Sequence, residues 1–288
     1  MINYNPKEWF TFIFRLHKAD TFRLLLPMLL SMTVYVFVVA YVEIEYFKLG
    51  ADSHLKNVTV MHGMLGFAIS LLLVFRTNTA YERWWEGRKL FGSLVNNCRN
   101  LALKLNAVLP ESDTERRNLF QTYIVEYAFA LKRHLRGHQH NSQLFTSVIE
   151  VSDKIHKPNY IASLLFKKVQ ELYNEKVISG EQLLFLNNEL SSLTDICGAC
   201  ERIKNTPIPF SYSVFIKKFV FFYVMTLPFG YVFTLGYLTI PIVVFVFYVL
   251  ASLEIIAEEI ENPFGTDAND LPLNQICKNI QKHVREII

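Results

Sequence analysis

Residues 58–75 read VTVMHGMLGFAISLLLVF, a run of 18 residues without Asp, Glu, Lys or Arg. An α-helix of about 20 apolar residues spans the hydrocarbon core of a bilayer, because each residue adds about 1.5 Å. The run includes Gly63, Gly66, Ala68 and Ser70, small residues that permit close contact between membrane helices. The stretch therefore predicts a transmembrane helix that packs tightly against a neighbour.

Three further apolar runs surround this one. Residues 24–42 carry no charge, and Pro27 lies in the first turns, where a missing N–H is tolerated. The last two runs are joined by the turn sequence GYLTIP, residues 236–241, and resemble a membrane hairpin. We therefore expect four transmembrane helices, at about 24–42, 58–75, 215–235 and 241–257.

The composition agrees with a membrane protein that has a polar middle. Of the 288 residues, 51% are hydrophobic and 19% are charged, against about 25% charged in soluble domains. The middle of the chain has a helical pattern without strand alternation. The prediction is an all-α membrane protein: residues 1–75 with two membrane helices, a cytoplasmic helical module at 76–210, two more membrane helices at 211–261, and a C-terminal strap at 262–288.

The distribution of Lys and Arg predicts the orientation. Cytoplasmic loops of membrane proteins are enriched in both residues. Only Lys48 and Lys56 lie between the first two runs, whereas the polar segments that precede the first run and follow the second carry many basic residues. Both termini and the helical module are therefore expected in the cytoplasm. No concentrated basic stripe suggests a nucleic acid partner.

The segment FRTNTAYERWWEGRK, residues 75–89, is rich in motifs. Trp84 and Trp85 suit a membrane interface, where an indole buries its ring and keeps its N–H hydrated. Arg83 beside them could pair with carboxylates from another helix. The alternative is an interfacial aromatic belt with arginines that reach toward water.

A second dense segment is EIIAEEIENPFGTDANDLP, residues 254–272. Glu254, Glu258 and Glu261 share one helix face, and the Asn-Pro pair that follows ends the helix. The acidic turn after it loosely resembles a calcium loop, although the EF-hand spacing and its final Glu are missing. The alternative is a solvated turn with ion pairs to the arginines of the first segment.

Two smaller groups have metal-ligand character. Cys197 and Cys200 have the spacing of a ligand pair, but no second pair accompanies them, so we expect reduced thiols that pack in a core. His134, His138 and His140 could bind a transition metal, but the polar residues around them favour a solvated loop.

The two dense segments, with Thr194–Tyr212 (TDICGACERIKNTPIPFSY), resemble the bestrophin family in its bacterial form. The resemblance covers roughly residues 21–282. It implies a homopentameric channel around one central pore in the bacterial plasma (inner) membrane, with the second helix of each subunit in a hydrophobic neck. Such a channel conducts small monovalent ions, either chloride-type anions or sodium-type cations. No cofactor is expected, and calcium, which eukaryotic members bind at the acidic turn, is not predicted.

The resemblance also assigns residues. The pore neck maps onto Gly63, Phe67 and Leu71, and the cytoplasmic aperture onto Glu181, with Gln182 or Leu183 as the alternatives if the alignment shifts by a residue. Five carboxylates at an aperture would favour cations. The family motifs, expected to make subunit contacts, are carried by Arg83, Trp84, Trp85, Glu258, Asn262, Pro263, Phe264, Gly265, Asp267 and Asp270.

Two other classes of protein remain as alternatives. A membrane enzyme would need a nucleophile with its base, a metal cluster or a phosphate-binding glycine loop; the sequence has no Walker-type or Gly-x-Ser-x-Gly motif, so we expect no enzymatic activity. A membrane-anchored helical scaffold or sensor without ion conduction would use the same four helices as an anchor.

Overall fold

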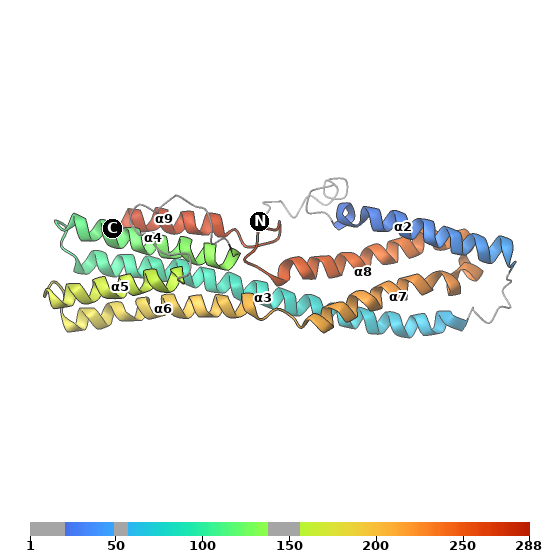
Figure 1. Ribbon diagram of the computed structural model, residues 1–288, viewed down its shortest axis with the longest axis horizontal. Helices are drawn as coiled ribbons and strands as arrows, with labels where there is room; N and C mark the ends of the chain where they lie inside the picture. Colours follow the sequence, from blue (N-terminus) through green and yellow to red (C-terminus); the bar gives the residue numbers. More distant parts are fainter. Residues whose placement is uncertain (1–20, 49–56, 138–155) are drawn as a thin grey trace. The chain divides into compact units, whose positions relative to one another are not determined.

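The computed structural model describes residues 21–48, 57–137 and 156–288, and these are helical with no strand among them (Figure 1). The helices, labelled as in Figure 1, are α2 (Thr21–Tyr41), α3 (Val58–Val108), α4 (Thr114–Arg136), α5 (Lys157–Asn174), α6 (Gly180–Asn205), α7 (Phe210–Leu235), α8 (Thr239–Glu261) and α9 (Leu273–Ile287). A π-helical turn, η1 (Val42–Tyr46), extends α2, and a 3₁₀ turn, η3 (Gly236–Leu238), joins α7 to α8.

The chain divides into two compact units. The apolar unit comprises the described residues up to Arg83 and residues 207–261; the polar unit comprises the described residues of 84–206 and residues 262–288. We predicted domain boundaries after residues 75, 210 and 261. The chain passes from one compact unit to the other after residues 83, 206 and 261. Residues 262–288, expected as a C-terminal strap, belong to the polar unit. As predicted, the helix that starts as the second apolar run continues into the polar module, because α3 contributes to both units.

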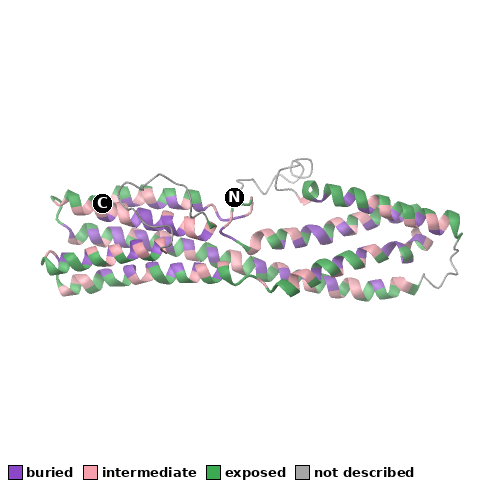
Figure 2. Ribbon diagram, viewed as in Figure 1, coloured by how far each residue is buried: buried purple, intermediate pink, exposed green. Residues whose placement is uncertain are grey.

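The apolar unit contains α2, the start of α3, α7 and α8. Leu25, Leu29, Met32 and Val36 recur every three or four residues on α2 and are buried in its core, as helical periodicity requires. Exposed positions also recur along α2 (Figure 2). Many of these outward side chains are apolar, for example Leu30, which is 61% exposed. A helix that is apolar all round suits a membrane rather than water.

Three helical segments have the length and hydropathy of membrane spans: Thr21–Tyr46, Val58–Val108 and Phe210–Glu261. The third has 52 residues and contains both α7 and α8. The apolar runs predicted at 24–42 and 58–75 lie within the first two segments. The count of four membrane helices stays a prediction.

The polar unit is a bundle of the later part of α3 with α4, α5, α6 and α9, around a core of buried apolar side chains (Figure 2). Local sequence signals set its helix ends. Asp113 caps the start of α4, Gly137 ends that helix in the left-handed conformation at φ 72°, and Ser179 with Gln182 forms a capping box at α6. The helix α9 packs on α4 and buries Cys277.

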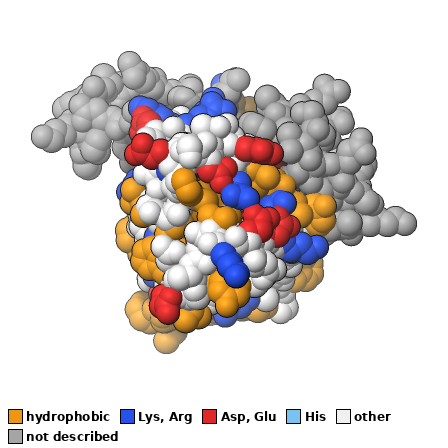
Figure 3. Space-filling model, turned by 90° about the vertical axis from the view of Figure 1, so that its left-hand side faces the viewer, with side chains coloured by type: hydrophobic (Ala, Val, Ile, Leu, Met, Phe, Trp, Pro, Cys, Tyr) orange, Lys and Arg blue, Asp and Glu red, His pale blue; other side chains and the backbone are white. Residues whose placement is uncertain are grey.

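One end of the polar unit carries the α3–α4 and α5–α6 turns, where acidic and basic side chains mix with hydrophobic ones (Figure 3). One ion pair connects the two turns. The Arg116 guanidinium contacts Asp113 at 2.7 Å and also pairs with Glu175. Charges of both signs are typical of a face in contact with water.

Candidate functional site

The predicted neck residues share one exposed face of α3. Phe67 is 73% exposed, Leu71 is also exposed, and a Cβ added to Gly63 would meet open space. The opposite side of the helix carries Ile69 and Leu73, which are buried in the core of the apolar unit. The isolated chain therefore leaves the Gly63–Phe67–Leu71 face uncovered inside a segment apolar enough for a membrane.

Two glycines hold α3 against α7 and so fix which face remains free. A Cβ at Gly66 would lie 2.8 Å from the Tyr223 hydroxyl, and one at Gly230 would lie 3.0 Å from Thr59. A side chain at either position would therefore require its neighbour to shift. The predicted close contact of small residues is confirmed at Gly66, whereas Gly63 faces open space.

A buried ion cluster joins α3 to α8. Arg76 is 1% exposed, and its guanidinium lies 2.7 Å from the Glu261 carboxylate and 3.6 Å from that of Glu254. Glu258, on the same acidic face of α8, pairs instead with Lys217 at 2.8 Å. The predicted ion pairs between the acidic helix and an arginine of the 75–89 segment are therefore present, with Arg76 as the arginine.

Two other residues of the 75–89 segment donate hydrogen bonds, one to the end of α8 and one to the turn that follows it. Nε of Arg83 donates to the backbone carbonyl of Glu261 at 3.1 Å, the last residue of α8, and so satisfies a helix-terminal acceptor. In the polar unit, Nε1 of Trp84 donates to the Asn269 carbonyl at 3.0 Å. Trp85 is exposed, and the Arg88 guanidinium lies 5.5 Å from its ring centre.

The Asn-Pro-Phe-Gly motif packs against the α3 part of the polar unit. Phe264 is fully buried, and a Cβ at Gly87 would lie 2.9 Å from Pro263 and 3.1 Å from the Phe264 ring. Because Gly87 has no side chain, the Phe264 ring can pack closely against α3 in the core. Asn262, which starts the motif, is exposed, and its carbonyl accepts the Gly265 N–H at 3.5 Å.

The acidic turn is closed by its own side chains. The Asp270 carboxylate accepts the Asp267 backbone N–H at 2.6 Å, and Asp270 is 2% exposed. A Cβ at Gly265 would lie 2.6 Å from the same carboxylate oxygen, so this turn requires glycine. The Asp270 carboxylate therefore has a structural role in this turn.

The predicted aperture residue, Glu181, is exposed in the first turn of α6. Its carboxylate accepts a hydrogen bond from the Ser179 hydroxyl at 2.6 Å, and this bond holds the pKa of Glu181 below its ordinary value. The two alternatives are occupied within the chain: Gln182 completes the capping box, and Leu183 packs against the core. Leu184, which is 74% exposed, flanks Glu181 on the free surface.

The cysteine prediction agrees with the structure. All four cysteines are free and buried, and burial raises the pKa of the Cys197 and Cys200 thiols to about 12. Both thiols belong to the core of the polar unit.

The histidine prediction changes. His138 and His140 lie outside the described residues. His134 belongs instead to a group with His156 and Glu201 that could hold a metal ion. These three residues come from separate parts of the sequence, so no local spacing pattern could have identified the group.

Comparison with known proteins gives the family to which this chain belongs. The family model for Bacterial/Fungal Bestrophin proteins matches residues 1–286. The chain belongs to the bestrophin family. Among its relatives, this bestrophin is 39% identical over 76% of its length to a Nostoc protein, and it covers 74% of that protein. It is 34% identical over 90% of its length to the Escherichia coli K12 protein YneE, and it covers 83% of YneE. Both relatives are named voltage-dependent anion channel-forming proteins.

Solved structures agree with this assignment. A bacterial bestrophin homologue from Klebsiella pneumoniae has a TM-score of 0.78 at 28% identity, with 91% of this chain and 98% of that chain covered. A crystal structure described as that of a membrane protein has a TM-score of 0.81 at 28% identity with the same coverage. The helical arrangement of this bestrophin is thus shared with experimentally solved relatives.

Proposed function

We propose that this bestrophin is an ion channel in which several copies surround one pore, and that α3 of each copy lines the neck. The observation that carries the proposal is the Gly63–Phe67–Leu71 face. It is apolar, it lies in a candidate membrane span, and its own chain leaves it uncovered while it buries Ile69 and Leu73 on the opposite side. The names of the relatives support the same function.

The neck acts by excluding water. A ring of Phe67 side chains around an axis forms a narrow apolar constriction, and such constrictions gate by dewetting. Gly63 adds no side chain above this ring, and Leu71 continues the apolar surface one turn below. The close packing of Gly66 against Tyr223 supports this orientation of α3, because a bulkier residue there would force the helix away from α7.

We propose a homopentamer in the bacterial inner membrane, embedded in lipid, with four membrane helices per subunit and with both termini and the polar unit in the cytoplasm. The bestrophin family supports the oligomer, and the Lys and Arg distribution supports the orientation. The motif residues from Arg83 to Asp270 make contacts within their own chain. The exposed motif residues are proposed for contacts between subunits: Trp85, Glu258, Asn262 and Asp267.

The proposed second constriction is a ring of Glu181 side chains at the cytoplasmic end of the permeation path. Its support is that Glu181 is exposed, whereas Gln182 and Leu183 are engaged within the chain. Exposed carboxylates in such a ring attract small monovalent cations and oppose anions. This contrasts with the anion selectivity in the names of the relatives.

No cofactor and no enzymatic activity form part of this function, and the acidic turn is proposed to be structural. The alternative is a membrane-anchored scaffold or sensor that buries the Phe67 face without forming a pore. Purified protein reconstituted in planar bilayers distinguishes the two. We expect single-channel currents from the wild type. Silent bilayers from a folded, oligomeric preparation would favour the scaffold.

A further inference from the structure

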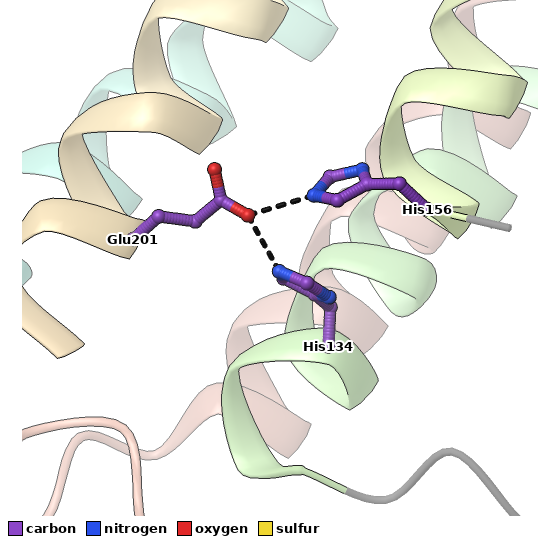
Figure 4. Close-up of side chains that lie close together, drawn as sticks. All are labelled: His134, His156 and Glu201. Carbon is purple, nitrogen blue, oxygen red and sulfur yellow. Dashed lines mark hydrogen bonds and ion pairs between the residues drawn. The ribbon is translucent and has the colours of Figure 1, made fainter. Parts of the chain in front are cut away.

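Three side chains from three elements of the polar unit converge on one point (Figure 4). His134 lies in the last turn of α4, His156 caps the start of α5, and Glu201 lies on α6. Nε2 of His134 is 2.6 Å from Oε1 of Glu201, and Nε2 of His156 is 2.7 Å from the same oxygen. The centres of the two imidazole rings are 4.4 Å apart.

This set of atoms matches the preference of a transition metal. One ligand atom from each residue lies within 4.8 Å of the other two. Two imidazole nitrogens with one carboxylate oxygen form a known three-residue set for Zn²⁺, which takes water as its fourth ligand. Between 24% and 32% of each side chain is exposed, so an ion and its water ligands can reach the group from solvent.

We propose that His134, His156 and Glu201 bind one divalent transition-metal ion of the zinc type in each subunit. The two histidines bind through Nε2 and Glu201 binds through its carboxylate, while water completes the coordination. The site would connect α4, α5 and α6 through a single ion, and it is independent of ion conduction by the neck.

The geometry needs only a small adjustment. Metal–ligand bonds of about 2.0–2.2 Å place the ligands of a tetrahedral ion about 3.3 Å apart. The Glu201 oxygen now lies closer than this to both nitrogens because it accepts hydrogen bonds from them. A rotation of the partly exposed Glu201 side chain away from the two nitrogens lengthens both contacts and makes room for the ion.

Metal binding also changes a proton position at the start of α5. Nδ1 of His156 accepts the backbone N–H of Asn159 at 3.2 Å, which requires that nitrogen to be unprotonated. When Nε2 binds a metal, the neutral ring carries its proton on Nδ1 instead. The cap hydrogen bond is then exchanged for the metal bond, and the exposed Asn159 N–H turns to water. Metal binding therefore removes one hydrogen bond that caps α5 and adds metal–ligand bonds that link α5 to α4 and α6.

The contacts of Glu201 with His134 and His156 also have an explanation that involves no ion. The competing explanation for the same contacts is a histidine–carboxylate clamp that holds three helices together without an ion.

Isothermal titration calorimetry of the full-length protein in detergent, with ZnCl₂ as the probe and with CaCl₂ and MgCl₂ for comparison, separates the two explanations. We expect one Zn²⁺ per chain, a higher Tm with zinc, and no comparable response to the two hard ions. His134→Ala and Glu201→Gln should each weaken zinc binding by at least about 10-fold. His283→Ala is the matched control, since His283 lies on α9 against Arg99 and should leave the affinity unchanged.

Glu201→Gln keeps the size and an acceptor oxygen of the side chain, so a folded variant is expected. Anomalous diffraction at the zinc edge from wild-type crystals gives a test that needs no variant. The expected result is a peak between the three residues. The absence of saturable binding, equal affinity in all variants, or a zinc peak elsewhere would overturn the site and support the metal-free clamp.

Discussion

The Arg76 guanidinium lies 2.7 Å from the Glu261 carboxylate, and Arg76 is 1% exposed. Glu254 also lies beside it, at 3.6 Å. Removal of one partner from a buried ion cluster leaves the other charges uncompensated. We therefore predict that Arg76→Met lowers the free energy of unfolding by about 3–5 kcal/mol, measured by denaturant unfolding in detergent.

The matched control for that variant is Lys217→Met. The Lys217–Glu258 pair has a similar separation of 2.8 Å, but both side chains are about half exposed, at 48% and 57%. An exposed pair contributes only about 0–1 kcal/mol. Equal losses of stability from both variants would show that the buried cluster has no special role.

Phe67→Ala is predicted to raise open probability or conductance in planar bilayers, because it removes the apolar ring that resists wetting. Phe222→Ala on α7 is the control. Phe222 is 63% exposed, close to the 73% of Phe67, but it lies outside the proposed neck. Unchanged currents in Phe67→Ala would move the constriction to another part of the permeation path.

Glu181→Gln is predicted to shift the reversal potential under a salt gradient toward anion selectivity, since it neutralises the proposed ring of carboxylates. Glu286→Gln on α9 serves as the control for loss of one exposed carboxylate. An unchanged reversal potential in Glu181→Gln would place the selectivity elsewhere.

The same residue predicts a pH dependence. The Ser179 hydroxyl lowers the pKa of Glu181, so the cation preference should be lost at a lower pH with this hydrogen bond than without it. Ser179→Ala removes the hydrogen bond, raises the pKa, and should move this loss of cation preference to higher pH. Reversal potentials recorded across a pH series check the direction.

Gly87→Ala is predicted to destabilise the polar unit by about 1–3 kcal/mol through overpacking, because the new methyl group would lie 2.9 Å from Pro263. Gly92→Ala on the same helix is the control. A Cβ there meets nothing within 4 Å, and the change should stabilise the helix by about 0.5–1 kcal/mol. Opposite signs of the two effects in thermal unfolding are the expected result.

Hydropathy and short motifs were sufficient to predict the helical class, the first two apolar helices and the continuation of α3 into the polar module. These features depend on residues that are neighbours in sequence. The shared face of Glu254, Glu258 and Glu261 was also predictable from helical spacing, but its division between Arg76 and Lys217 depends on which helices meet. The His134–His156–Glu201 group and the need for glycine at residue 87 could not be predicted from the sequence, because they too depend on which segments meet in the fold.

The polar unit is assembled from two stretches of chain, 84–206 and 262–288, with the apolar α7 and α8 between them. A ribosome makes α9 and the Phe264 segment only after both intervening helices have been synthesised. Cys277, Ile280 and Val284, which are buried in the finished unit, therefore reach α4 late in biogenesis. Until then the nascent module exposes an apolar seam, so its completion must wait for the α7–α8 hairpin to leave the ribosome.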